Sequence, residues 1–337
     1  MQYQTLGPSG LYVSRICIGS ATFGAGPLAD EADRIVRRAL DLGINFFDTA
    51  NSYGNQPRFD RPGAPSAAER ASAEEIMGKA LRGHREEIVL ASKLSEAIGP
   101  GPNDGRSPGP SSVNPGGGLT RYHMVREVDR SLQRLGTDHL DILYAHHPDP
   151  TTPLEQTMQA FDDLVRAGKI RYAALSTFPA WQMVEALWIC DRLGLHKPIC
   201  NQVMYSMVSR EVEREIVPAC MRTGMTLTAF SPLGGGLLAG AAVLERSVSG
   251  WQRFGSTRTY PPDHVDLARR VEALGAEWGI AAAPLALAWL LSRPTLTSAI
   301  VGPEEVDEVD ANVRALDVEL DAAQLAQLDE VLGPVSP

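Results

Sequence analysis

The repeated alternation of short apolar segments with longer amphipathic segments is the feature that most constrains the fold. Eight apolar segments occur along the 337 residues, near positions 16, 44, 88, 140, 171, 199, 225 and 298. Short apolar runs predict buried strands, and the segments between them have the apolar spacing of helices. Repeated strand–helix units predict a parallel sheet, and eight of them predict a closed barrel. We therefore expect one α/β domain over residues 1–337, a (β/α)8 TIM barrel. A doubly wound sheet is less favoured, because no G-x-G-x-x-G follows the first strand.

The remaining segments complete this barrel. Residues 3–6 and 11–14 flank a turn-rich tetrad, which predicts an N-terminal β-hairpin that plugs one end of the barrel. Three segments are rich in Gly, Pro, Ser or Arg and lack an apolar period, so we expect long loops at 55–71, 98–118 and 241–262 that cover a substrate pocket at the C-terminal face. Helices are expected over 30–42, 74–81, 120–135, 153–167, 180–193, 210–221, 264–278, 284–291 and 304–316.

Composition restricts the class of protein and its partners. The chain is 44% hydrophobic and 21% charged, which is typical of a soluble globular protein. No apolar run approaches the roughly 18 residues that span a bilayer, and the first residues lack a signal-peptide pattern, so a cytoplasmic location is expected. A net charge of −10 disfavours nucleic acid and anionic membrane as partners. The four cysteines have no metal-like pairing and are expected to be reduced, mostly buried thiols.

Four polar side chains are expected to meet at the mouth of the barrel. Asp48 ends the second strand, Tyr53 follows it after a short turn, and Lys93 and His146 end the third and fourth strands. Barrel enzymes carry their catalytic groups at the C-terminal ends of strands and in the loops that follow. Each residue alone is more often structural, for example an Asp that caps a turn. Their shared location therefore carries the prediction of an active site.

These side chains suit the protonation of a carbonyl oxygen. A phenol with a pKa of about 10 is a weak acid with a proton to give. A neighbouring ammonium such as Lys93 is expected to lower the pKa of Tyr53, and Asp48 can hold that ammonium in place. His146 can donate a hydrogen bond to the same substrate oxygen. No metal site is expected, because His146 and His147 are sequence neighbours with divergent side chains and no third ligand is evident. We expect no special role for His147.

The sequence resembles the aldo-keto reductase superfamily, in particular its bacterial branch similar to potassium-channel β-subunits. The resemblance covers nearly the whole chain, through residues 43–54, 88–93, 132–150, 152–176, Gln202, 230–236 and 300–312. It implies that Tyr53 is the proton donor, that Lys93 and Asp48 tune its pKa, and that His146 orients the substrate. It also implies a nicotinamide dinucleotide that binds to the barrel without a Rossmann fold.

The cofactor positions implied by the resemblance lie in the second half of the chain, apart from Ser20. Gln202 and Ser176 would hold the carboxamide, and Phe230 would stack on the nicotinamide ring. The loop at Ser231, Leu233 and Gly236 would cover the pyrophosphate, where glycine allows close backbone approach. The adenosine end would lie at the start of a helix, whose amides suit a phosphate, with Gly302, Glu304, Glu308 and Asn312.

Three departures from the family pattern concern cofactor binding. Thr177 follows Ser176 where the family usually has Asn, and Ala241 follows Gly240 where a basic residue is common. Glu304 stands where a basic residue often faces the 2′-phosphate of NADP, although an arginine at 246, 253 or 258 could compensate. The resemblance favours NADP, with NAD as the alternative.

The expected function is the NAD(P)H-dependent reduction of an aldehyde or ketone, or the reverse oxidation, with Tyr53 as general acid. The partner is then a small carbonyl or alcohol, and specificity is expected to lie in the three long loops. One alternative is a regulatory module that holds the cofactor and turns over slowly. Another is a barrel lyase in which Lys93 forms a Schiff base.

Overall fold

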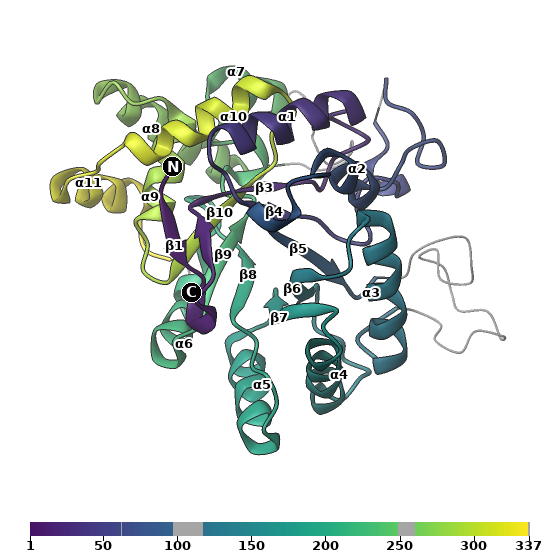
Figure 1. Ribbon diagram of the computed structural model, residues 1–337. Helices are drawn as coiled ribbons and strands as arrows, with labels where there is room; N and C mark the ends of the chain where they lie inside the picture. Colours follow the sequence, from purple (N-terminus) through teal and green to yellow (C-terminus); the bar gives the residue numbers. More distant parts are fainter. Residues whose placement is uncertain (62, 97–116, 249–259, 336–337) are drawn as a thin grey trace.

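Eight parallel strands close into a barrel at the centre of the molecule (Figure 1). The computed structural model describes residues 1–61, 63–96, 117–248 and 260–335. Around the barrel the strand order is β10-β3-β4-β5-β6-β7-β8-β9, so consecutive strands are neighbours and β10 closes on β3. The expected (β/α)8 TIM barrel is confirmed. Its strands are β3 (Ile16–Gly19), β4 (Phe46–Asp48), β5 (Val89–Leu94), β6 (Leu140–Ala145), β7 (Ile170–Ser176), β8 (Cys200–Met204), β9 (Thr226–Phe230) and β10 (Leu296–Val301).

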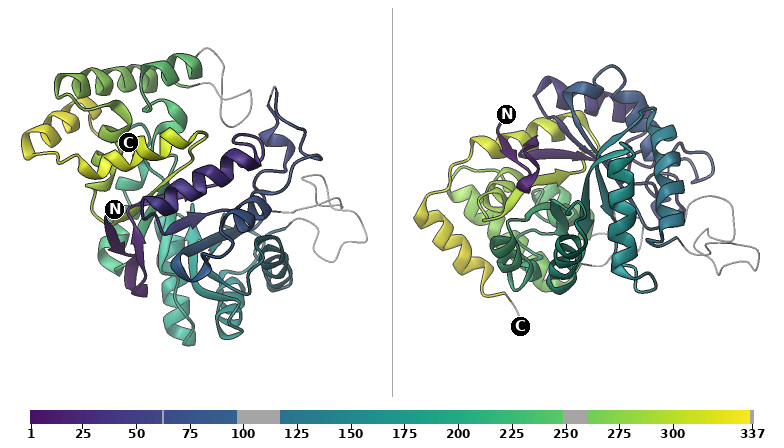
Figure 2. Two further views of the ribbon diagram at one scale, coloured as in Figure 1. Left: turned by 45° about the horizontal axis from the view of Figure 1, so that its top comes forward. Right: turned by 60° about the horizontal axis from the view of Figure 1, so that its bottom comes forward.

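Helices surround the barrel, as the three views show (Figures 1 and 2). The connection between β9 and β10 carries two additional helices, α7 and α8, before α9. Among the described residues no single helix is long and apolar enough to cross a membrane, and α8 with α9 meets that test only as a pair bent by 98°. The helices are α1 (Ala29–Asp41), α2 (Ala73–Ala80), α3 (Arg121–Leu135), α4 (Leu154–Arg166), α5 (Ala180–Leu193), α6 (Ile216–Thr223), α7 (Ala241–Val248), α8 (Pro262–Glu277), α9 (Ala282–Leu291), α10 (Val306–Val313) and α11 (Ala322–Leu332).

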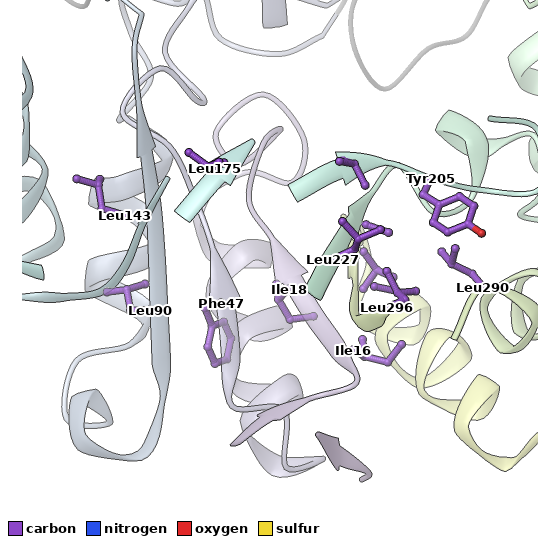
Figure 3. Close-up of a cluster of buried hydrophobic side chains, with 14 of the residues drawn as sticks. Ile16, Ile18, Phe47, Leu90, Leu143, Leu175, Tyr205, Leu227, Leu290 and Leu296 are labelled. Atoms are coloured by element: carbon purple, nitrogen blue, oxygen red, sulfur yellow. The ribbon is translucent and has the colours of Figure 1, made fainter. Parts of the chain in front are cut away.

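Alternating strand residues divide the core into two layers. Successive side chains of a strand point to opposite faces of the sheet. One set packs between the strands and the helices, including Ile16, Ile18, Phe47, Leu90 and Leu143 (Figure 3). The other set fills the barrel interior, and its strand residues are Cys17, Phe46, Val89, Ala91, Ile142, Tyr144, Ala174, Cys200 and Ile300. Both faces of each strand are therefore buried, which explains the continuous apolar runs in the sequence.

The N-terminal hairpin closes one end of this interior. Strands β1 (Tyr3–Thr5) and β2 (Tyr12–Ser14) pair antiparallel, with Gln4 opposite Val13. Leu6 and Val13 are fully buried within the interior cluster of the barrel. The expected hairpin and its role as a plug are both confirmed.

Three helix predictions differ from the structure. The segment 241–262, expected to be a loop, begins with helix α7. The expected helix over 210–221 is divided into a 3-10 turn (Glu211–Glu213) and α6. Helix α11 was not expected, although Asp321 and Gln324 form a capping box at its start. Most of the expected loop at 98–118 lies outside the described residues.

Candidate active site

The candidate active site lies where the inward-facing rows of three strands reach the C-terminal end of the barrel. Residues two apart in a strand face the same side. Asp48, Lys93 and His146 each lie two positions after a side chain of the interior cluster, namely Phe46, Ala91 and Tyr144. Parallel pairing of β4 with β5 and of β5 with β6 brings these strand ends together. The same alternation that buries the apolar residues therefore directs three polar groups to one place.

Asp48 and Lys93 form a buried ion pair. Lys93 Nζ donates to Asp48 Oδ1 and, at 3.0 Å, to the carbonyl oxygen of Thr49. Gln202 Nε2 donates to the other carboxylate oxygen, Asp48 Oδ2, at 2.9 Å. The side chains of Lys93 and Asp48 are only 1% and 3% exposed. Burial opposes the charge on Lys93, but Asp48 and Tyr53 outweigh it and raise the pKa of Lys93. The ammonium therefore remains charged near neutral pH.

Tyr53 follows β4 and faces both Lys93 and His146. Tyr53 Oη lies 3.3 Å from His146 Nε2, and the two rings meet edge to face with centroids 5.6 Å apart. Lys93 Nζ lies 4.9 Å from the centroid of the Tyr53 ring. An acid, an ammonium and an imidazole thus converge, as the sequence predicted.

The expected lowering of the Tyr53 pKa is wrong. Burial raises the pKa of the Tyr53 phenol, and this outweighs the opposite effect of Lys93. Burial, reinforced by Lys93, also holds the pKa of His146 well below its usual value. Near neutral pH the phenol keeps its proton and the imidazole is uncharged. The sequence argument counted the neighbouring ammonium but could not weigh the loss of solvent around the phenol.

A cavity of about 620 Å³ adjoins these groups. It reaches from the Tyr53 side to the start of α10, so the expected catalytic and cofactor positions share one space. The predicted residues that line it are Asp48, Tyr53, His146, Ser176, Gln202, Phe230, Ser231, Leu233, Gly236, Gly302, Glu308 and Asn312.

Three predicted residues do not line the cavity. Lys93 is buried behind Asp48 and Tyr53. Ser20 is fully buried, and its hydroxyl donates to the Asp48 carbonyl at 3.1 Å while Ala21 and Thr22 face the cavity. Glu304 forms an ion pair of 3.0 Å with Arg61, and both side chains are largely buried. The direct cofactor role expected of Ser20 is therefore not supported by its position.

Several positions expected to hold a dinucleotide lie in the loop after β9 and in α10. Gly234, Gly235 and Gly236 have φ values of 61°, 71° and 110°, a conformation that glycine adopts without strain, and Gly235 and Gly236 line the cavity. Phe230 ends β9 and presents a half-buried ring to the cavity. At the far end, Glu308 Oε2 accepts a hydrogen bond of 2.8 Å from the Glu304 amide, at the start of α10. The arginines at 253 and 258, and the side chain of the one at 246, lie outside the described residues.

Sequence reasoning missed a charged cluster on the wall of the cavity. Arg58, Glu96 and His147 line it beside His146. Arg58 Nη2 lies 2.9 Å from Glu96 Oε2, and His147 Nε2 lies 3.5 Å from Glu96 Oε1. His147, for which no special role was expected, is part of this cluster. Its position directly after His146, with Glu96 three residues after Lys93, was the available signal.

The charge on Glu96 is stabilised within this cluster. Burial opposes ionisation, but a hydrogen bond from His147 and the nearby Arg58 guanidinium outweigh it and lower the pKa of Glu96 to about 2. A carboxylate that is charged near neutral pH therefore lies beside His146, and one guanidinium pairs with it.

Comparisons with known proteins agree with this geometry. The model of the aldo/keto reductase family matches residues 15–332. The chain is 36% identical to the uncharacterized oxidoreductase YrpG of Bacillus subtilis, over 99% of this chain and 97% of that protein. It is 34% identical to a probable voltage-gated potassium channel subunit beta of Oryza sativa (94% and 92%) and 29% identical to L-glyceraldehyde 3-phosphate reductase of Escherichia coli (98% and 92%). Members of the family act on small carbonyl compounds and generally use NAD(P)H. The chain is an oxidoreductase that belongs to the aldo/keto reductase family.

Proposed function

We propose that this protein reduces an aldehyde or ketone with NADP(H), and that Tyr53 protonates the carbonyl oxygen. The observation that carries the proposal is the approach of Tyr53 Oη to His146 Nε2, at 3.3 Å, next to the buried Lys93–Asp48 pair. This arrangement puts a proton donor and a second polar group where one substrate oxygen can contact both.

The roles of the residues follow from their charge states. The raised pKa of Tyr53 keeps the phenol protonated, so it can donate. Once the proton leaves, the Lys93 ammonium stabilises the phenolate, and Asp48 with Thr49 holds that ammonium in position. The neutral imidazole of His146 orients the carbonyl oxygen through Nε2. A nicotinamide held by Ser176, Gln202 and Phe230 would supply the hydride. Enclosure of these groups strengthens every one of these interactions.

The proposed preference for NADP rests on Arg61. The sequence argument against this cofactor was repulsion between Glu304 and the 2′-phosphate. Arg61 Nη1 lies 3.0 Å from Glu304 Oε1, and Arg61 Nε donates to the Ala25 carbonyl at 2.9 Å. A guanidinium beside the carboxylate offsets its charge and can also bind a phosphate. This loop arginine, which the sequence argument did not consider, therefore favours NADP over NAD.

The Schiff-base alternative has less support. A Schiff base needs a neutral amine that the substrate can reach. Lys93 is 1% exposed, ion-paired and of raised pKa, which is the opposite state. The regulatory alternative differs from the proposal only in turnover, so a rate measurement separates the two.

The test is carbonyl reduction by Tyr53→Phe, followed as NADPH absorbance with a panel of aldehydes and ketones. Loss of the acid should lower kcat by roughly 10²–10⁴-fold while NADPH binding is kept, because the ring remains. Tyr172→Phe is a matched control, since Tyr172 donates to the Ser9 carbonyl at 2.8 Å beside the N-terminal hairpin, away from the site. A Tyr53→Phe variant with wild-type kcat would refute the proposed acid. A wild type that binds NADPH but reduces nothing in the panel would favour the regulatory alternative.

A further inference from the structure

We propose that Glu96, His146 and His147 form a binding site for a late divalent transition-metal ion such as Zn²⁺, on the wall of the cavity. One ligand atom from each residue, Glu96 Oε1, His146 Nδ1 and His147 Nε2, lies within 4.8 Å of the other two. Two imidazole nitrogens and one carboxylate oxygen are a ligand set that suits Zn²⁺. The cavity beside them leaves room for a fourth ligand, a water or a substrate oxygen.

The two histidine rings do not diverge, which removes the sequence argument against a metal. They stack with centroids 4.4 Å apart and an angle of 11° between their planes. Glu96 Oε1 lies 3.9 Å from His146 Nδ1 and 3.5 Å from His147 Nε2. Ligand atoms around a tetrahedral Zn²⁺ are about 3.4 Å apart, since each bond is about 2.1 Å long. The two distances from Glu96 Oε1 to the histidine nitrogens are thus already close to the separation of ligand atoms in a zinc site.

His146 Nδ1 supplies an independent indication of a missing partner. His146 is only 7% exposed, and within the described part of the chain its Nδ1 has no hydrogen-bond partner. Buried polar atoms without partners are rare in native structures and call for an explanation. This atom faces Glu96 Oε1 at a distance too long for a hydrogen bond. A cation between the two atoms would satisfy both.

The contact of Thr177 with His147, on the side of the ring away from Glu96, also favours a metal site. Thr177 Oγ1 lies 2.7 Å from the Ser176 carbonyl oxygen, to which it donates, and 3.1 Å from His147 Nδ1. His147 Nδ1 can therefore donate to Thr177, and in that tautomer the Nε2 atom that faces Glu96 offers its lone pair to an ion. Such outer contacts orient metal-binding histidines in proteins. Thr177 has a φ of 58°, a strained value for a β-branched residue, so its hydroxyl is held here at a cost.

The remaining features allow a metal to enter. Arg58 binds Glu96 Oε2 and leaves Oε1 for the histidines. The His147 side chain is 49% exposed, so its ring can turn out of the stack toward the other two ligands.

Occupancy of this site would act on the proposed reductase. The same imidazole that offers Nδ1 to the metal faces Tyr53 through Nε2. An ion bound at Nδ1 fixes His146 toward Glu96 and narrows the cavity beside Tyr53. We therefore expect Zn²⁺ to inhibit carbonyl reduction, an expectation that rests on the proposed function, whereas metal binding itself does not.

Direct binding of Zn²⁺ to the full chain, without a polyhistidine tag, tests the site. Calorimetry should show one saturable site per chain. Loss of even an outer contact costs about 10–100-fold in metal affinity, so Glu96→Gln and His147→Asn should each weaken binding at least 100-fold, and Thr177→Val about 10–100-fold. Glu87→Gln is a matched control, because Glu87 pairs with His84 at 3.0 Å on the surface and should bind no ion.

Two further measurements complete the test. Co²⁺ in place of Zn²⁺ should give a visible absorption band in the wild type that both ligand variants lack, and melting curves should show that the variants are folded. Zn²⁺ should inhibit the wild type much more than His147→Asn, each compared with its own metal-free rate. Absence of a saturable site in the wild type, or wild-type affinity in both ligand variants, would overturn the proposal. Binding without inhibition would keep the site and overturn only its effect on turnover.

Discussion

Replacing Asp48 by Asn tests the buried ion pair with a change of charge and little change of shape. In the wild type the Asp48 carboxylate accepts from Lys93 and Gln202. The variant leaves Lys93 buried, with the Thr49 carbonyl as its remaining strong acceptor. The Lys93 ammonium must then either stay charged without a counterion or give up its proton, which is unfavourable because its pKa in the wild type is raised. Either outcome lowers the free energy of unfolding.

The expected loss is large for a single substitution. Removing one partner of a buried pair costs about 3–5 kcal/mol, because the other charge stays buried. Solvent screening does not reduce this figure, since the two side chains are 1% and 3% exposed. An unfolding entropy of about 2.1 cal/mol/K per residue over 337 residues gives about 0.7 kcal/mol/K. The melting temperature should therefore fall by about 4–7 °C.

Thermal unfolding followed by circular dichroism measures this effect against a surface pair. Asp33 pairs with Arg37 at 2.7 Å, and these side chains are 36% and 65% exposed. Asp33→Asn should cost about 0.3–0.5 kcal/mol, or less than about 1 °C. Adding Lys93→Met to Asp48→Asn removes the orphaned charge and should recover more than half of the loss. Equal shifts for Asp48→Asn and Asp33→Asn would show that the buried pair does not have the assigned role.

Three more outcomes are expected. Phe230→Ala should weaken NADPH binding in a fluorescence titration while destabilising the fold by less than the roughly 3–5 kcal/mol of a fully buried Phe, and the opposite result would make Phe230 a core residue. Glu304→Arg removes the carboxylate that pairs with Arg61 and adds a second guanidinium there, so it should raise NADPH affinity more than NADH affinity, and an unchanged ratio would mean that this pair does not adjoin the 2′-phosphate. Burial opposes ionisation of the Asp162 carboxyl, but hydrogen bonds from Arg166 and His196 stabilise its charge and lower its pKa from 3.8 to about 2. Its contribution to stability is thus complete above pH about 3.8 and lost as the pH falls toward 2. The deficit of Asp162→Asn in urea unfolding should shrink over that range, and a constant deficit would contradict the assigned ion pairs.

The sequence alone determined the barrel and the location of the site. Strand and helix periods are local properties, so eight apolar runs with helices between them were sufficient to predict the closed sheet. Polar residues at three strand ends were sufficient to predict that Asp48, Lys93 and His146 meet. The alternation of side chains along each strand gives their direction, because side chains that continue the inward-facing row must point into the mouth of the barrel.

Tertiary structure decided the charge states and the pairings between distant segments. The pKa of Tyr53 depends on burial, which no residue pattern near it encodes, so its direction was predicted wrongly. Arg61 meets Glu304 across 243 residues of sequence. Glu96, Arg58 and His147 come from three separate loops that only the closed barrel brings together. Interactions of this kind follow from the packing of the whole chain, and a sequence period reports only the neighbours along one strand or helix.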